Sequence, residues 1–271
     1  MAIRVGHSAD PDDAFMFWAI DAGRVDTRGI EFEQVVSDIQ TLNEWATEGR
    51  LEVTAISMGA YPSVADHYML LPHGASFGEN YGPILVSQDE LTLDELRHEE
   101  IVIPGRLTTA YLVLRLLLGG DVRVRELPFD EILDEVSSGR ARVGLVIHEG
   151  QLTYAQAGLK RLVDLGVFWH GATGLPLPLG VTVIRRDLGE AIPGISAVLG
   201  DAIEVGLDQR DEALAYAEGY GRGIDSETAD RFVAMYVNEY TVDYGETGRR
   251  AVDELLRRSG TGVTAEFAPR R

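Results

Sequence analysis

Over roughly the first two thirds of the chain, segments with two kinds of apolar spacing follow one another in turn. Short apolar runs, often β-branched, predict strands, whereas apolar residues recurring every three to four positions predict helices. The predicted strands are at 3–5, 31–36, 53–57, 84–87, up to 104, 122–127, 143–147, 162–166 and 181–185. The predicted helices are at 14–22, 38–48, 92–96, from about 108 onward and 129–137.

The later part of the chain is predicted to be mostly helical. Residues from 189 onward have helical spacing, with breaks at 219–221 and 244–246, and 260–271 form a frayed tail. Two segments before it lack a regular pattern. One is a loop that holds Trp169 and His170, and the other is 174–180, where two prolines exclude a regular element.

The order of these elements predicts an α/β protein with two lobes. Strands and helices alternate, the chain leaves for a second similar unit, and a strand returns before the terminal helices. We expect one discontinuous lobe at 1–87 plus 183–271 and a smaller lobe at 88–182. This is the type II periplasmic-binding-protein-like architecture, in which the ligand is expected in the cleft between the lobes.

Composition narrows the expected partners. The 271 residues contain 24 Lys and Arg against 44 Asp and Glu, a formal net charge of −20. Such a surface repels nucleic acid and anionic membranes, so neither is an expected partner. Solubilising charge and adaptation to high internal salt both account for the excess, and both stay open. The chain has no cysteine, which excludes disulfides and thiolate metal sites.

The first residues enter a strand directly and lack the basic and apolar regions of a secretory signal. No apolar run approaches the roughly 18 to 20 residues of a membrane span. We therefore expect a cytoplasmic protein with no membrane insertion.

One buried strand ends in a titratable side chain. Residues 143–147 are apolar without alternation, which is typical of a strand covered on both faces in a parallel sheet, and His148 follows directly. Open α/β sheets bind ligands at the carboxyl ends of their strands, and a histidine there can take and return a proton. His148 is thus a candidate general base. The alternative is a structural histidine bonded to a backbone carbonyl.

The loop after the first strand is a second candidate. Its sequence is Gly6-His7-Ser8-Ala9-Asp10-Pro11-Asp12-Asp13. It lacks the glycines of a dinucleotide site, and its aspartates would repel phosphate. We expect Asp12 or Asp13 to cap the next helix, and Ser8 and Asp13 to contact a polar substrate. A metal site of His7, Asp10 and Asp12 is an alternative.

Two further strand ends carry hydroxyl groups. Ser57 closes the strand at 53–57, and no Gly-x-Ser-x-Gly surrounds it, so a hydrogen-bonding role fits better than a nucleophile. Thr108 or Thr109 would cap the helix after Pro104, and that helix N-terminus would suit a carboxylate. Ordinary capping is compatible with binding there.

Together these motifs resemble the 1,4-dihydroxy-6-naphthoate synthases of the futalosine route to menaquinone. The resemblance covers nearly the whole chain and is carried by Ser8 with 11–15, 104–111, 147–149, 174–180 and 236–238. It implies a cytoplasmic carbon–carbon lyase without metal or organic cofactor. The implied substrate is cyclic dehypoxanthinylfutalosine, an anionic, sugar-containing small molecule, and the implied product is 1,4-dihydroxy-6-naphthoate.

The resemblance also implies residue roles. His148 falls on the family's proton acceptor. Two segments fall on substrate contacts, namely Ala55, Ile56 and Ser57, and Thr108 with Thr109.

One motif departs from the family. The family loop reads Ser-Pro-Cys-Pro-Asn-Asp-Thr-Phe, whereas this chain has Ser8-Ala9-Asp10-Pro11-Asp12-Asp13-Ala14-Phe15. Added negative charge there would weaken binding of a substrate carboxylate. A chorismate dehydratase-like enzyme and a non-catalytic small-molecule binding protein of the same fold therefore stay as alternatives. Monomer and homodimer are both compatible with the sequence.

Overall fold

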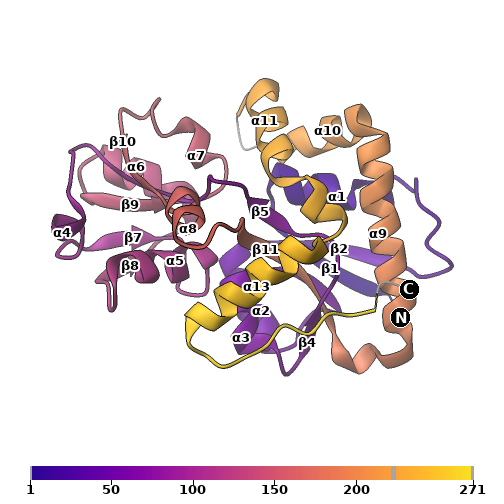
Figure 1. Cartoon of the computed structure of the whole chain (residues 1–271). Coiled ribbons are helices and arrows are strands. Elements are labelled where there is room, and N and C mark those ends of the chain that lie inside the picture. The colour runs from indigo at the N-terminus through magenta and orange to yellow at the C-terminus, as the bar shows by residue number, and fades with distance from the viewer. Residues whose placement is uncertain (1, 221–223, 270–271) are drawn as a thin grey trace. The chain divides into compact units, whose positions relative to one another are not determined.

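The computed structural model describes residues 2–220 and 224–269 of the chain (Figure 1). These residues form two compact units. The large unit comprises Met1–Phe77 and Pro178–Arg271, and the small unit comprises Gly78–Leu177. Each unit has its own sheet covered by helices, so the predicted α/β class is confirmed.

The large unit contains a six-stranded mixed sheet in the order β2-β1-β3-β11-β4, with β5 also paired to β11. Strand β1 is parallel to β2 and β3, whereas β11 is antiparallel to β3 and β4. The strands are β1 (Ile3–His7), β2 (Phe32–Val36), β3 (Val53–Ser57), β4 (Tyr68–Leu70), β5 (Ser76–Gly78) and β11 (Leu177–Arg185).

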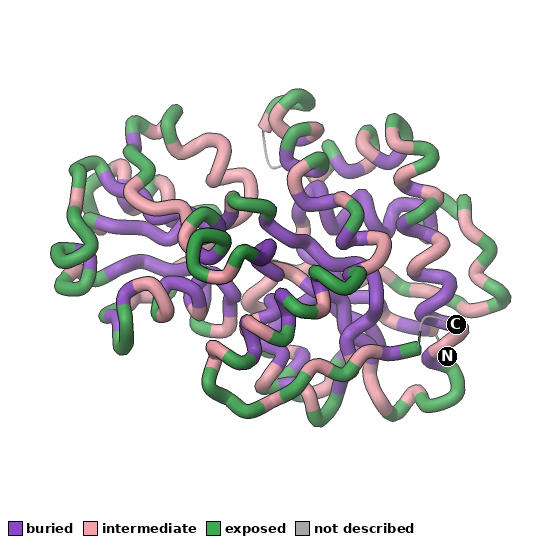
Figure 2. The backbone as a smooth tube through the Cα atoms, viewed as in Figure 1, coloured by how far each residue is buried: buried purple, intermediate pink, exposed green. Residues whose placement is uncertain are grey.

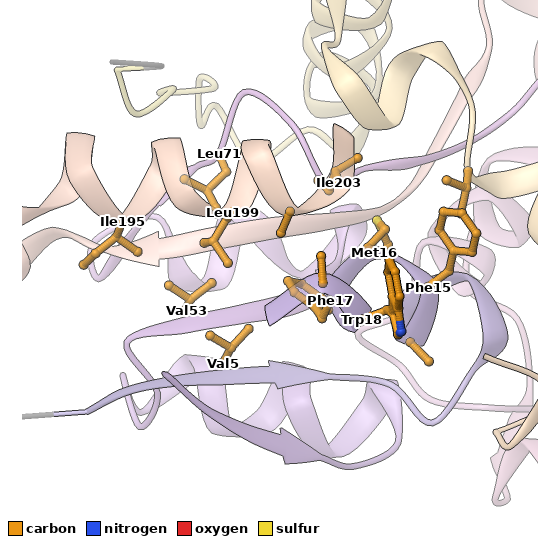
Figure 3. Close-up of a cluster of buried hydrophobic side chains, with 14 of the residues drawn as sticks. Val5, Phe15, Met16, Phe17, Trp18, Val53, Leu71, Ile195, Leu199 and Ile203 are labelled. Carbon is orange, nitrogen blue, oxygen red and sulfur yellow. The ribbon is translucent and has the colours of Figure 1, made fainter. Parts of the chain in front are cut away.

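Helices of the large unit bury one face of this sheet in an apolar core. Val5 and Val53 meet Phe17 of α1 and Leu199 of α9 in that core (Figure 3). Helix α1 is buried along almost its whole length because α9, α10 and α11 also pack on it. The helices are α1 (Pro11–Asp21), α2 (Ile39–Thr47), η1 (Met58–Ala60), α3 (Tyr61–Val64), η3 (Arg186–Ala191), α9 (Ile192–Asp208), α10 (Arg210–Glu218), α11 (Ser226–Tyr236), α12 (Glu239–Val242) and α13 (Gly245–Ser259).

The small unit has a five-stranded sheet in the order β10-β6-β9-β7-β8. Strands β9, β7 and β8 are parallel, and β6 is antiparallel to both β9 and β10. Strand β9, which the sequence pattern predicts to lie in a parallel sheet, thus has one parallel neighbour, β7, and one antiparallel neighbour, β6. Strands β6, β7 and β9 are fully buried (Figure 2). The strands are β6 (Ile84–Ser87), β7 (Ile101–Ile103), β8 (Val124–Glu126), β9 (Val143–Val146) and β10 (Lys160–Asp164).

Short helices connect these strands. Ile132 and Val136 of α6 join β6 and β9 in the core of the unit. Helix α5 ends at Gly119, which takes a left-handed conformation with φ of 79°. The helices are α4 (Leu93–Leu96), α5 (Thr109–Leu118), η2 (Phe129–Glu131), α6 (Ile132–Ser137), α7 (Gly150–Thr153) and α8 (Leu165–Thr173).

The unit boundaries differ from the predicted lobes at both crossings. The prediction assigned residues up to 87 to the large lobe, but β6 pairs with β9 and β10 in the small unit. It assigned residues up to 182 to the small lobe, but β11 pairs with β3 from Gly180 onward. A strand belongs to the unit whose strands it pairs with. These pairing partners lie far away in the sequence, so the local pattern did not predict the boundaries.

Two predictions about irregular segments were wrong. Trp169 and His170 lie in α8, not in a loop, because Asp164 caps that helix through the Gly166 and Val167 amides. Segment 174–180 was predicted to be irregular, yet β11 begins at Leu177, since Pro178 precedes the residues paired with β3.

The tail is not frayed where it crosses β4. Leu70 donates its amide to the Glu266 carbonyl (2.9 Å), and Ala268 donates to the Leu70 carbonyl (2.7 Å). The tail therefore covers the edge of β4, a position that an unpaired strand would leave open. A helix break was also predicted at 219–221. Helix α10 ends with Gly219 as its C-cap, and residue 221 lies outside the described residues.

Candidate active site

The predicted site residues of the large unit gather at one edge of its sheet. Strands β1 and β3 are parallel neighbours, so their carboxyl ends meet at the same edge. Ser57 closes β3, and the loop with Ser8 and Asp13 follows β1. Ala55 and Ile56 lie within β3, opposite Thr182 and Val181 of β11, and both are buried.

Ser57 is held from two sides by one side chain that the sequence analysis did not single out. The Asn43 side-chain oxygen accepts the Ser57 amide at 2.8 Å, and its nitrogen donates to the Ser57 hydroxyl at 3.1 Å. Asn43 is fully buried and Ser57 is 4% exposed. Because the hydroxyl accepts from Asn43, its own hydrogen is directed elsewhere, as a substrate-binding donor requires.

The only sign of this contact in the sequence is that Asn43 lies on the buried face of the helix predicted at 38–48. Asparagine is a weak helix former, and a buried amide needs hydrogen-bond partners. The identity of the partner depends on the packing of α2 against β3.

The loop after β1 forms a buried ionic cluster. Asp13 accepts the Ser8 amide at 2.7 Å, Asp10 accepts the Ser8 hydroxyl at 2.6 Å, and Asp12 accepts from Ser76 at 3.0 Å. All three aspartates are less than a tenth exposed. Burial raises the pKa of the Asp13 carboxyl, although the charge of His7 and the bonds from Ser8 act in the opposite direction.

His7 borders this cluster. Its Nδ1 lies 2.8 Å from the Ser8 carbonyl oxygen, and its Nε2 lies 3.0 Å from Gln34 Oε1. The Gln34 amide nitrogen donates to the Phe17 carbonyl, which leaves Oε1 facing His7 as an acceptor. Both ring nitrogens of His7 therefore lie within hydrogen-bond distance of a carbonyl oxygen.

These bonds correct two expectations about the loop. Helix α1 begins at Pro11, so its N-cap position is Asp10, not Asp12 or Asp13, and the Asp10 side chain makes no capping hydrogen bond. His7, Asp10 and Asp12 do not form a metal site, since within 2–220 and 224–269 no group of three such side chains is placed to hold an ion.

In the small unit, Thr108 caps α5 as the sequence predicted. Its hydroxyl accepts the Tyr111 amide at 3.2 Å and donates to the Gly105 carbonyl at 2.8 Å. Thr109 is the first helical residue, and both threonines are buried. The first turn of a helix carries amide groups without intrahelical partners and a partial positive charge, which together favour a carboxylate.

His148 lies two residues beyond β9 at the same edge of the sheet as the α5 N-terminus. Strands β7 and β9 are parallel neighbours, so Thr108 and His148 follow adjacent carboxyl ends. His148 is half-buried and has a φ of 55°, in the left-handed region that few non-glycine residues adopt. Such backbone strain costs on the order of 1–3 kcal/mol and occurs preferentially at functional sites.

Three other histidines are less suited to proton transfer than His148. His7 has both nitrogens bonded within its buried cluster. His73 is 2% exposed and its Nε2 contacts the Ser196 carbonyl at 2.8 Å. His170 is exposed on α8. Of the described histidines, His148 alone combines a strand end, partial exposure and a strained backbone.

Comparison with known proteins first defines the class. The fold matches a solved Candida albicans protein described as having the generic periplasmic binding protein fold, with a TM-score of 0.66 and 14% identity. That match covers 98% of this chain and 92% of the other. Together with the two α/β units, it confirms the predicted periplasmic-binding-protein-like fold. None of the helices in the described ranges has the length and apolar character needed to cross a bilayer.

Sequence comparison then gives the family. The menaquinone biosynthesis family matches residues 3–260. A 1,4-dihydroxy-6-naphthoate synthase of Thermus thermophilus is 40% identical and covers 99% of this chain and 98% of its own. One of Streptomyces coelicolor is 34% identical over 98% of this chain and 96% of its own. The chain belongs to the 1,4-dihydroxy-6-naphthoate synthase family of menaquinone biosynthesis.

Proposed function

We propose that this protein is a cytoplasmic lyase that converts cyclic dehypoxanthinylfutalosine to 1,4-dihydroxy-6-naphthoate. The names of its relatives support the product, and the arrangement of His148 supports the chemistry. The observation that carries the proposal is a half-buried histidine with strained backbone beside a capped helix N-terminus. These two features supply a proton acceptor and an anion-binding group at one sheet edge.

His148 acts as the general base in this proposal. Neutral imidazole takes a proton from the substrate to begin opening of the spirocyclic sugar adduct, and aromatisation of the naphthoate drives the reaction forward. The resulting imidazolium can return the proton to the leaving sugar fragment. General acid–base catalysis of this kind is worth a factor of about 10² to 10⁴ in rate.

The remaining predicted residues bind and orient the substrate. The α5 N-terminus at Thr108 and Thr109 would hold the substrate carboxylate, because its amides and dipole favour negative charge. Ser57 would donate a hydrogen bond, with its orientation fixed by Asn43.

The cluster after β1 suits a different part of the substrate. Ser8 and Asp13 are bonded to each other, and the loop carries three carboxylates. Carboxylate oxygens accept hydrogen bonds from hydroxyl groups and repel carboxylates. In this proposal the loop therefore faces the sugar hydroxyls, and the departure from the family sequence affects the sugar end only.

Incubation of the protein with cyclic dehypoxanthinylfutalosine, followed by chromatography, tests the proposal. We expect 1,4-dihydroxy-6-naphthoate to appear in proportion to enzyme and time. A parallel incubation with chorismate tests the dehydratase alternative. Conversion of chorismate alone, or tight binding of either compound without product, would replace the proposal by the corresponding alternative.

A further inference from the structure

Three loops of the small unit meet at the carboxyl edge of its parallel strands. Strands β8, β7 and β9 are adjacent and parallel, and their loops carry Phe129, Thr108 and His148. The Phe129 ring contacts the His148 ring with centroids 4.7 Å apart and planes at 73°. This is the edge-to-face arrangement that aromatic pairs prefer.

We propose that Phe129 is a positioning residue that holds the His148 imidazole in its catalytic orientation. The proposal rests on His148 being the general base. No feature of the sequence pattern alone connects these two residues, because Phe129 and His148 belong to different strand–helix connections.

The packing of α6 fixes where Phe129 lies. Phe129 begins the short helix η2, which runs directly into α6. Helix α6 approaches β9 closely at Gly144, where a Cβ atom would lie 2.7 Å from Ile132 and 2.8 Å from Val136. The glycine thus lets α6 pack directly on β9, the strand that precedes His148, and the Phe129 ring lies against the His148 ring.

The contact with Phe129 restricts the imidazole of His148, which lies outside the regular backbone of β9. His148 lies just beyond the end of β9, in a turn with φ of 55°. A flat aromatic ring against the imidazole limits its rotation, and small displacements of a catalytic group lower the rate strongly, by as much as about 10²-fold per ångström. A branched aliphatic side chain would fill the space without making the edge-to-face ring contact.

The test compares Phe129→Leu, Phe129→Tyr and the control Phe168→Leu. Phe168 is a half-buried phenylalanine of α8 in the same unit, so its replacement controls for the loss of an aromatic ring. Imidazole C–H signals in carbon–proton NMR spectra report the ring contact without substrate, and the His148 signal is assigned by its absence in His148→Asn. Steady-state kinetics with cyclic dehypoxanthinylfutalosine report the positioning.

We expect Phe129→Leu to move the His148 signal and to lower kcat by about tenfold with a smaller change in KM. The interaction of an aromatic pair, converted to a rate, corresponds to a factor of about ten. Phe129→Tyr retains the ring and should restore most of kcat. Phe168→Leu should change neither the signal nor kcat.

The outcomes separate this proposal from the proposed function. An unmoved His148 signal in Phe129→Leu overturns the contact, whatever the activity. A moved signal with wild-type kcat, or an equal loss of kcat in Phe129→Tyr, overturns the positioning role and leaves the lyase in place. A moved signal with no product from the wild type overturns the lyase, and the positioning role with it.

Discussion

In each unit, the sheet edge that carries the candidate residues is held in a different way. In the large unit, side-chain hydrogen bonds hold the edge, through Asn43 on Ser57 and through the aspartates after β1. In the small unit, the Thr108 hydroxyl also makes capping hydrogen bonds, but close contacts at glycines position α6 and α8. A Cβ at Gly144 would press on α6, and one at Gly166 would overlap the backbone of Tyr81.

This difference predicts different sensitivities. Hydrogen bonds between buried polar groups depend on protonation and on the loss of either partner. Close contacts at glycine depend on volume and are indifferent to pH. Substitutions in the large unit should therefore show their effects through pH and unpaired polar groups, and those in the small unit through added methyl groups.

The largest effect is expected for Gly166→Ala. The new Cβ would lie 2.0 Å from the Tyr81 carbonyl carbon and oxygen, which are backbone atoms that cannot rotate away. We expect the free energy of unfolding to fall by about 3 kcal/mol or more, measured by urea denaturation.

Gly171→Ala is the matched control in the same helix. In the described structure, no atom outside its own helix neighbourhood lies within 4 Å of the Cβ position at Gly171. Alanine there should stabilise the helix by about 0.5–1 kcal/mol. Equal effects of the two substitutions would contradict the importance of the Gly166 contact.

Asn43→Ala should have the next largest effect. It removes the acceptor of the buried Ser57 amide, and an unpaired buried donor costs about 1–3 kcal/mol. Ser57→Ala keeps the hydrogen bond from the backbone amide of residue 57 to Asn43, so it should lower the free energy of unfolding by less. A larger loss of stability in Ser57→Ala than in Asn43→Ala would show that Asn43 does not hold this edge.

Two buried carboxyls of the large unit should respond to pH with opposite signs. Burial raises the pKa of Asp13 above 3.8, so its contribution to stability is present below that pH and is lost as pH rises through the folded-state pKa. Burial also acts to raise the pKa of Glu52, but hydrogen bonds from Arg4 outweigh it and lower the pKa from 4.5. The contribution of Glu52 is thus present above 4.5 and is lost as pH falls through its folded-state pKa.

At pH 7 we therefore expect Asp13→Asn to raise the thermal midpoint and Glu52→Gln to lower it. The Asp13→Asn difference should shrink as the pH is lowered toward 4, whereas the Glu52→Gln difference should persist down to 4.5 and shrink only below it. Thermal midpoints at four or five pH values provide the measurement. Two differences of the same sign at pH 7 would refute the electrostatic account of this edge.

The smallest effect is expected for Tyr244→Phe. The Tyr244 hydroxyl is buried and has no hydrogen-bond partner among the described residues, so burial raises its pKa and its removal relieves a desolvation cost. We expect a gain of about 1 kcal/mol in urea denaturation. Tyr68→Phe is the control, because the Tyr68 hydroxyl donates to the Leu51 carbonyl at 2.7 Å, and its loss should destabilise. A clear loss of stability in Tyr244→Phe would mean that the hydroxyl is satisfied.

The sequence predicted those parts of the site that depend on local pattern. The end of β9 before His148 and the cap at Thr108 both follow from residues adjacent in the chain. The contacts of Asn43 and Phe129 could not be predicted, because each depends on how a helix packs on a strand from another part of the chain. The strand across Pro178 was missed for a related reason, since its pairing partner β3 lies more than a hundred residues earlier.

The most direct test of the account is turnover and ligand binding in His148→Asn, with His170→Asn as control. Asparagine keeps similar size and a hydrogen-bonding edge, so the fold and the affinity for cyclic dehypoxanthinylfutalosine should change little. Turnover should fall by about 10² or more, the scale of a lost general base, and His170→Asn should match the wild type. Full turnover in His148→Asn, or a loss explained entirely by weaker binding, would contradict the assignment of His148 as the proton acceptor.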